Sequence, residues 1–462
     1  MRYGSTRGQA PDAGFTDVLL EGLAPDGGLY HPQAWPDLAP SVLDPGCAYV
    51  VRAEAVLHGF AGSEDPLAEH LHSACQAAYA RFQSPAVTPL VQIDADLWLL
   101  ELFHGPTLAF KDIALQLMAQ LYDQALARAG RRLTVLVATS GDTGGAAAAA
   151  LAGLANIDLF ILLPEGRVSD VQRRFMTTTG AENVHALSVS GDFDDCQRLV
   201  KAAFAEEAFR RDYDLSGVNS INWVRIAAQS VYFLAAGAAL PGPAAFYAPT
   251  GNFGDCLAGW VAGRLGLEID SLTAAVNAND ALAQFVSHGM ARRQAALATL
   301  SPAMDINVAS NLERLVFEAF DRDGAATARA YEGFADTGRL SVPSAAHAKL
   351  AAAIRAVSVD DGRTIAEMAR VHAETGQLID PHTAVGVAAA RDRPPKTPGA
   401  PRVVLATAHP AKFPDAVHEA TGRHPQAPER CGDLFERPEK LSPLTADLQA
   451  LKTQVAERAP RP

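Results

Sequence analysis

The sequence predicts an α/β fold built around parallel sheets, with helices on both faces of each sheet. From residue 131 onward, short apolar runs typical of buried strands alternate with longer runs whose apolar residues recur at helical spacing. Three loops rich in glycine and small polar residues also follow such strand-like runs. Folds of this class bind ligands beyond the carboxyl ends of their strands. The pattern therefore indicates both the fold class and the part of the chain where function should lie.

Composition narrows the class of protein further. The chain has 462 residues, enough for two or three domains, and its net charge of −13 argues against nucleic acid or acidic membranes as partners. An anionic ligand would have to be held by local groups, such as backbone N–H groups at helix N-termini. No apolar run could span a membrane and no apolar signal core opens the chain, so we expect a cytoplasmic protein.

The cysteines and histidines predict no metal site. The five cysteines are scattered and form no CxxC pair, which is typical of reduced, individually buried thiols. His372, His382 and His409 lack metal-ligand spacing, and the segment 380–386 is explained by an Asp N-cap followed by proline.

The first hundred residues predict a turn-rich segment, with a hairpin around residues 25–28 and a helical patch at 65–82. Strands and helices then alternate. The expected strands lie at 131–140, 157–166 and 183–191, and the expected helices at 144–155, 169–179 and 193–209. Two later segments, 244–266 and 402–422, each predict a strand, a loop and a helix. The last residues, 456–462, predict a frayed tail.

Lys111 stands at the start of a strongly helical run, directly after a Gly-Pro turn. In the first turn of a helix the dipole disfavours an ammonium group. Apolar neighbours would desolvate the amine further, namely Phe103, Leu108 and Phe110. These effects favour a nucleophilic amine that could form a Schiff base, although an ordinary surface lysine explains the segment equally well. Asp112 would oppose them only if its carboxylate faced the amine.

The three polar loops lie at 139–145, 249–255 and 406–413. Glycines let the backbone approach an oxyanion, and Ser140 and Thr143 in the first loop add hydroxyl donors. For any single loop, chain reversal and helix N-capping are sufficient explanations, and Asp142 could be such a cap. Two glycine-rich loops together with a candidate Schiff-base lysine suit two separate phosphates, one on a cofactor and one on a substrate.

Taken together, these segments resemble threonine synthases, which are fold-type II (tryptophan synthase β-like) enzymes that use pyridoxal 5′-phosphate (PLP). The motifs follow the family's order along almost the whole chain. They are YGSTRG (3–8), PDGGLY (25–30), HGPTLAFKD (104–112), TSGDTGGAA (139–147), NSINWVRI (219–226), PTGNFGD (249–255) and LATAHPAKF (405–413).

The resemblance implies roles for the cofactor-binding residues. Lys111 matches the lysine that holds PLP as a Schiff base, and Thr407 matches the residue that faces the pyridine nitrogen. A second set matches the loop whose backbone cradles the PLP phosphate and the residue at its end, namely Gly251, Asn252, Phe253, Gly254 and Asp255.

The resemblance also implies substrate-binding residues. One set matches the loop that meets the amino-acid part of the substrate, namely Ser140, Gly141, Asp142 and Thr143. An anionic Asp142 would repel a substrate carboxylate unless it turned away or were hydrogen-bonded elsewhere. Asn219 and Arg225 are candidates for the substrate phosphate, although a structural salt bridge explains Arg225 at least as well.

The reaction implied is conversion of O-phospho-L-homoserine and water to L-threonine and phosphate, by γ-elimination followed by β-addition of water. This is the last step of threonine biosynthesis, and the protein would be a monomer or homodimer. One alternative is another fold-type II enzyme, such as a threonine/serine dehydratase or a β-replacing synthase, which would need no second phosphate site. The other is a catalytically silent PLP-fold protein, which the intact Lys111 disfavours.

The resemblance further implies two parallel-type α/β domains after an N-terminal hairpin and helical segment at residues 1–100. Residues 101–130 and 216–462 would form a large PLP-binding domain. Residues 131–215 would form a smaller, movable domain that carries the substrate loop and closes to exclude water.

Overall fold

The computed structural model describes residues 1–139 and 141–460 of the chain. The described chain forms two compact units. Unit 1 consists of residues 1–76, 82–104 and 220–426, and unit 2 consists of residues 77–81, 105–219 and 427–460.

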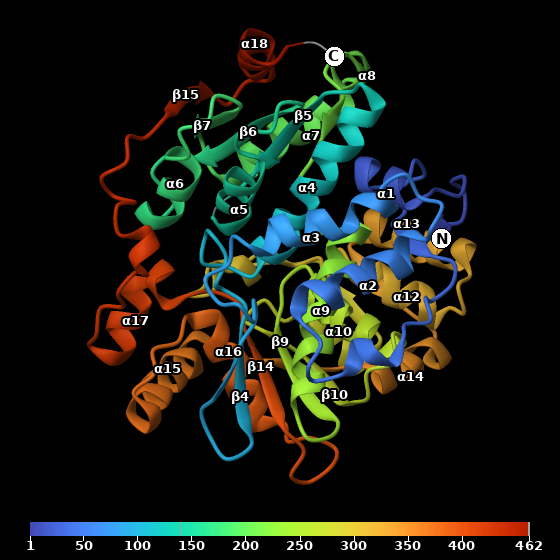
Figure 1. The fold of residues 1–462 in the computed structure, drawn as a ribbon, viewed down its shortest axis with the longest axis vertical. Helices are drawn as coiled ribbons and strands as arrows, with labels where there is room; N and C mark the ends of the chain where they lie inside the picture. The colour runs from blue at the N-terminus through green and yellow to red at the C-terminus, as the bar shows by residue number, and fades with distance from the viewer. Residues whose placement is uncertain (140, 461–462) are drawn as a thin grey trace. The chain divides into compact units, whose positions relative to one another are not determined.

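Unit 2 is built on a five-stranded sheet in which all neighbouring strands are parallel (Figure 1). In the order β15-β7-β6-β5-β8, the strands are Leu441–Thr445, Val184–Ser190, Ile157–Pro164, Leu133–Ala138 and Leu215–Ser216. β6 is buried along its whole length, as expected for a central strand of a sheet covered on both faces.

The helices of unit 2 cover both faces of this sheet. They are α4 (Lys111–Ala129), α5 (Asp142–Leu151), α6 (Asp170–Thr177), α7 (Phe193–Ala205), α8 (Glu207–Asp212) and α18 (Leu448–Arg458). One core joins α7 and α18 to the strands, through side chains such as Phe160, Leu199 and Leu451. α4 and α5 pack on β5, where Met118, Val135 and Ala147 line one small cavity.

Unit 1 is built on a six-stranded sheet that is parallel except where β3 pairs with β4. In the order β13-β10-β9-β14-β4-β3, the strands are Arg355–Ser358, Ile269–Val276, Ala244–Pro249, Arg402–Ala406, Leu97–Glu101 and Leu90–Gln92. Two antiparallel pairs stand apart from it, namely β1 (Tyr3–Ser5) with β2 (Tyr30–Pro32), and β11 (Met290–Arg292) with β12 (Arg339–Ser341).

Helices also cover both faces of the larger sheet (Figure 1). α15 (Asp361–Thr375), α16 (Pro381–Asp392) and α17 (Pro414–Thr421) share a core with β4, β9 and β14. α9 (Trp223–Ala239) and α10 (Gly254–Arg264) pack together on the sheet, where Phe233 contacts Phe246. The remaining helices are α1 (Phe15–Glu21), α2 (Tyr49–Ala61), α11 (Ala281–His288), α12 (Leu312–Ala319), α13 (Gly324–Thr337) and α14 (Ser344–Ala353), with α3 (Leu71–Tyr79) crossing from unit 1 to unit 2.

These two sheets confirm the predicted parallel α/β fold class. The N-terminal segment differs from the predicted hairpin around residues 25–28. Its residues before the turn form α1, because Phe15, Val18 and Leu19 recur at helical spacing and are all buried. The turn exists, with the Gly28 N–H donating to Asp26 Oδ1 at 2.9 Å, but the strand after it pairs with β1.

The compact units divide the chain differently from the predicted domains, which stay a prediction. Unit 2 includes α4 and the chain from residue 427 onward. α4 packs against α5, and β15 extends the sheet by pairing with β7. Which unit binds PLP and which one moves stay predictions.

Two further features concern the described residues as a whole. No helix among them has both the length and the apolar character that crossing a bilayer requires. Nor do His, Cys, Asp and Glu side chains in this part of the chain gather in a group that could hold a metal ion.

His31 on β2 lies in an aromatic cluster inside unit 1. Its ring meets Trp35, Trp223 and Phe317 edge-on, at centroid distances of 5.4, 5.3 and 5.6 Å. Its Nε2 lies 2.8 Å from Oε1 of Glu318. Burial nevertheless lowers the pKa of His31 from 6.5 to about 4, so the ring is neutral at physiological pH.

This buried ring should make the protein less stable in acid. The folded pKa lies below the unfolded value, so the unfolded state binds more protons between pH 6.5 and about 4. The free energy of unfolding should therefore fall as the pH drops through this window, by roughly 1 to 3 kcal/mol. Urea denaturation at several pH values should show a flatter dependence for His31→Gln. The exposed His72→Gln should behave like the parent, and identical pH dependence in all three proteins would contradict the account.

Candidate active site

Lys111 is the first residue of α4, where the sequence pattern expects that helix to begin. The turn before it is tight, with the Leu108 N–H donating to the Gly105 carbonyl and Leu108 at a φ of 61°. Glycine is needed at 105 because a Cβ there would lie 2.4 Å from Asp112 Cβ. The Lys111 side chain is only 11% exposed, and its Nζ lies 5.5 Å from the centroid of the Phe110 ring. A largely buried amine thus stands at a helix N-terminus.

The carboxylate of Asp112 braces this turn. Its Oδ2 accepts from the Thr107 N–H and its Oδ1 accepts from the Thr107 hydroxyl, both at 2.7 Å. Asp112 and Thr107 are fully buried. The orientation that the sequence left open is therefore toward the preceding turn, and it fixes the backbone from which Lys111 projects.

Asp142, at the first position of α5, supplies a carboxylate near Lys111. Its Oδ2 lies 3.7 Å from Lys111 Nζ, and its Oδ1 accepts a hydrogen bond of 3.2 Å from Gln172 Nε2 on α6. The Asp142 side chain is only 4% exposed. Its negative charge is therefore directed at an amine and an amide, which is one of the arrangements that would limit repulsion of a substrate carboxylate.

The Thr139 side chain stabilises the loop before α5 by hydrogen bonds. Thr139 Oγ1 accepts from the N–H groups of Gly141 and Gly144, at 3.1 and 3.2 Å. Gly141 and Asp142 are buried and Thr143 is half-buried at the start of the helix. Ser140, which was also expected in this set, lies outside the described residues.

The second glycine loop follows β9 and leads into α10. Gly251 packs so closely that a Cβ there would lie 2.8 Å from the Ala303 carbonyl oxygen. Phe253 is fully buried and adopts a left-handed conformation with φ at 65°, and Thr250 Oγ1 accepts from its N–H at 3.1 Å. The loop is therefore a strained and tightly packed entry to a helix.

This loop offers unpaired donors. No described residue accepts a hydrogen bond from the N–H groups of Gly251, Asn252 or Gly254. These three residues are half-buried, and N–H groups without protein partners at a helix N-terminus favour an anion there. Asn311 steadies the loop, because its Nδ2 donates to the Asn252 carbonyl at 3.1 Å.

Arg225 and Asp255 are two buried charged residues of unit 1 that influence each other electrostatically without forming an ion pair. Burial lowers the pKa of Arg225 to about 10, and the charge of Asp255 opposes this shift. Burial likewise raises the pKa of Asp255, although hydrogen bonds from the Thr250 hydroxyl and the Cys256 N–H favour its charged form. No carboxylate of the described residues lies within ion-pair distance of Arg225, so it retains hydrogen-bonding capacity for an anion.

The third loop lies at the same sheet edge as the second. Thr407 is 4% exposed and directly follows β14, which is the strand next to β9. Because β9 and β14 run parallel, Thr407 and the glycine loop both lie at carboxyl ends within unit 1. Asn219 is half-buried and ends the segment 105–219 of unit 2, four residues before the first residue of α9.

Sequence reasoning missed two polar residues that hold the loops. Gln172 bonds to Asp142, and Asn311 bonds to the Asn252 carbonyl. Gln172 lies in α6 and Asn311 directly precedes α12, and they are 30 and 59 residues away in sequence from their partners. No sequence motif or spacing predicts these two residues, because their roles depend on which helices pack together.

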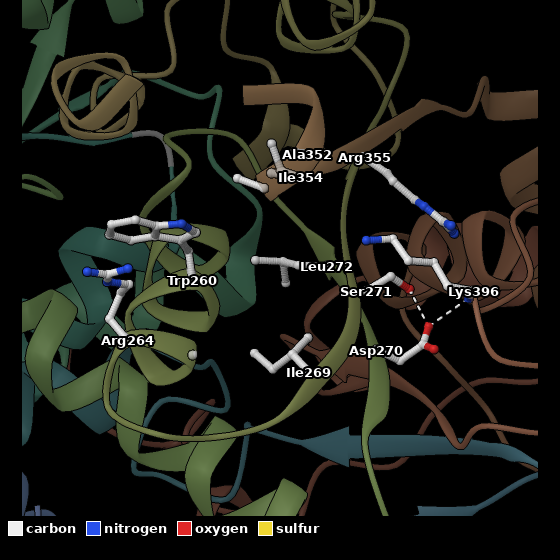
Figure 2. A pocket seen from close by; sticks show the side chains of 12 residues that line it. Trp260, Arg264, Ile269, Asp270, Ser271, Leu272, Ala352, Ile354, Arg355 and Lys396 are labelled. Atoms are coloured by element: carbon white, nitrogen blue, oxygen red, sulfur yellow. Dashed lines mark hydrogen bonds between the residues drawn. The ribbon is translucent and has the colours of Figure 1, made fainter. Parts of the chain in front are cut away.

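The pocket in Figure 2 lies elsewhere in unit 1. Trp260 and Arg264 of α10 lie on one side, while Lys396 lies on the other, where its N–H donates to Asp270. The volume is about 600 Å³, counting its open mouth. Residues from the amino end of β10 line it, so it faces away from the strand ends that carry the polar loops.

Comparison with known proteins covers the whole chain. Three family models match, described as threonine synthase N terminus (residues 2–79), pyridoxal-phosphate dependent enzyme (82–407) and threonine synthase, C-terminal (383–455). A threonine synthase of Pseudomonas aeruginosa is 44% identical, over 100% of this chain and 99% of the relative. One from Corynebacterium glutamicum is 37% identical, over 99% of this chain and 98% of the relative.

Solved structures agree with these matches. The crystal structure of PLP-bound threonine synthase from Brucella melitensis superposes with a TM-score of 0.96 at 47% identity, covering 99% of both chains. Threonine synthase from yeast superposes with a TM-score of 0.93 at 35% identity, covering 99% of this chain and 98% of the yeast chain.

The packing of Gly251 leads to a test of the second loop. Gly251→Ala should weaken binding of PLP about tenfold or more, because the added Cβ would push the loop from the Ala303 carbonyl. An absorbance titration of the PLP-free protein measures this affinity. Gly333→Ala is the matched control, since nothing lies within 4 Å of a Cβ at that position of α13. Equal affinities for the two variants would refute the assignment of the loop.

Proposed function

Because the chain belongs to the threonine synthase family, we propose that it converts O-phospho-L-homoserine and water to L-threonine and phosphate, with PLP as its cofactor. This is the last step of threonine biosynthesis. The single observation that carries the residue assignment is the largely buried Lys111 amine at the start of α4, next to the Asp142 carboxylate.

The residues present fit PLP. An aldehyde requires an amine, which Lys111 would provide, and a phosphate requires donors, which the unpaired N–H groups of Gly251, Asn252 and Gly254 would provide. Phe253 would complete this cradle. Thr407 would face the pyridine nitrogen, where a hydroxyl leaves that nitrogen largely unprotonated. When bound, PLP supplies an electron sink for the carbon centres of the substrate.

Lys111 would act as the acid–base group. Its Nζ would take the proton from Cα of the substrate and later one from Cβ. In the protonated state it becomes an ammonium within a few ångströms of the Asp142 carboxylate. That carboxylate would stabilise the charge in a largely buried environment, where an unpaired ammonium would be costly.

The substrate would be oriented by two sets of groups. The start of α5, with Ser140, Gly141, Asp142 and Thr143, would meet its amino-acid part. Asn219 and Arg225 are proposed for its phosphate, where the Arg225 guanidinium could form two parallel hydrogen bonds. Donors already in place stabilise a phosphate dianion as it leaves, without reorganisation at that moment.

We further propose that the protein works in the cytoplasm on this small molecule, without nucleic acid or membrane partners and as a monomer or homodimer. The net charge of −13 supports the absence of nucleic acid. The N–H groups of the 251–254 loop would hold one phosphate and Arg225 the other, so an acidic protein could nevertheless bind both.

Replacing the amine tests the proposal. Lys111→Ala should lower the rate of phosphate release from O-phospho-L-homoserine by about three orders of magnitude or more, while the circular dichroism spectrum is unchanged. Lys201→Ala removes a lysine exposed on α7 and should retain full activity. Near-parental turnover by Lys111→Ala would refute the assignment.

The choice of substrate needs a separate measurement. The parent protein should release phosphate from O-phospho-L-homoserine and should form threonine, detected by chromatography. A dehydratase would instead release ammonia from threonine or serine. Ammonia release without phosphate release would favour the dehydratase. If the protein showed no visible absorption band that borohydride removes, a catalytically silent PLP-fold protein would be favoured.

A further inference from the structure

A chain of polar contacts leads to Lys111 from Ser169 and Gln172, two residues that have no part in the reaction proposed above. It begins at Ser169, the N-cap of α6, whose hydroxyl donates to Gln172 Oε1 at 3.1 Å. Gln172 Nε2 donates to Asp142 Oδ1 at 3.2 Å, and Asp142 Oδ2 lies 3.7 Å from Lys111 Nζ. All four residues belong to unit 2. A buried amide therefore connects a helix cap to the carboxylate beside the amine.

The fit around the Gln172 amide is tight. Gln172 is 7% exposed, and a Cβ at Gly141 would lie 2.5 Å from its Nε2 and 2.9 Å from its Cδ. The φ of Gly141 is 172°, which any residue can adopt, so its conformation does not require glycine. Glycine is required at 141 because the Gln172 amide approaches so closely. The loop that carries Asp142 thus leaves room for this one side chain.

Capping of α6 does not account for the Gln172 side chain. The cap is made by the Gln172 backbone, whose N–H donates to Ser169 Oγ at 3.4 Å. The side-chain amide instead has one end on Ser169 and the other on Asp142. An amide held at both ends fixes the direction of the carboxylate that it contacts.

We propose that Gln172 is a positioning residue for the reaction, whose side-chain amide holds the Asp142 carboxylate as the countercharge of the Lys111 nitrogen. With Oδ1 bound to the amide, Oδ2 is left directed at Lys111. This inference rests on the proposed role of Lys111 as the PLP-binding lysine. It assigns the side chain of Asp142 to the lysine and leaves the backbone of its loop for the substrate.

Other charged groups on the neighbouring elements are directed elsewhere. Arg173 of α6 bonds to Glu439 and to Asp170, and Arg174 donates to the Leu434 carbonyl. Asp112 of α4 accepts from Thr107. Asp142 is therefore the carboxylate whose placement should respond when the Gln172 amide is removed.

The experiment is a pH titration of the visible absorption band of the holoenzyme, which reports protonation of the nitrogen that Lys111 contributes. Asp142→Asn should lower the midpoint by about one pH unit, because a nearby carboxylate favours the protonated nitrogen. Gln172→Met keeps the size of the side chain but removes the amide. It should lower the midpoint by about half a unit in the parent and by nothing further in the Asp142→Asn background.

A matched control lies on the same helix. Asp170→Asn removes a carboxylate whose side chain is 70% exposed, and it should leave the midpoint unchanged. Should Gln172→Met fail to fold, Gly141→Ala provides a second route, because its Cβ would displace the amide. It should shift the midpoint in the same direction, again only when Asp142 is present.

Two failures can be told apart. If Lys111→Ala retains the same visible band as the parent, the proposed role of Lys111 is wrong. If the band depends on Lys111 but the midpoint shifts equally in both Asp142 backgrounds, or does not shift in either, Gln172 does not act through Asp142. Either of the latter results would overturn this inference and leave the proposed function intact.

Discussion

The placement of charge at helix N-termini is the constraint on which the candidate site depends. The dipole of α4 disfavours a cation at its first residue, Lys111, whereas the dipole of α5 favours an anion at its first residue, Asp142. The two side chains lie 3.7 Å apart, so the favourable end of one helix offsets the unfavourable end of the other. The unpaired N–H groups at the start of α10 also lie at a helix N-terminus, where they would favour the phosphate proposed for this loop despite the net charge of −13.

Much of the fold could be predicted from apolar periodicity. β5, β6, β7, β9 and β14 all lie within the segments expected as strands, because buried parallel strands are short apolar runs bounded by turn residues. The Asp N-cap with a following proline at residues 380 and 381 was also predicted correctly. β4 was missed, although it lies inside the larger sheet, because the segment around it is dominated by turns. The prediction of a hairpin was wrong for α1, because the Gly-rich turn that follows it also fits a hairpin.

The candidate site could be predicted only in part, because motifs identify residues but not their partners. Lys111 and the glycine loops follow from local sequence, since helix starts and tight turns have local signatures. The partners of Asp112 and Asp142 do not, because they depend on how a turn folds back and on how α6 packs beside α5. The same reasoning explains why Gln172 and Asn311 were missed. Tertiary packing selects such residues, and no local sequence pattern marks them.

Lys111 is the residue proposed to hold the cofactor, and mass spectrometry of the reduced holoenzyme can identify the lysine that does so. Borohydride would fix PLP to the amine that holds it, and digestion would release the labelled peptide. A phosphopyridoxyl group is expected on the peptide that contains Lys111 and on no other lysine. A label on another lysine, or no label in a protein that retains its visible absorption band, would contradict it.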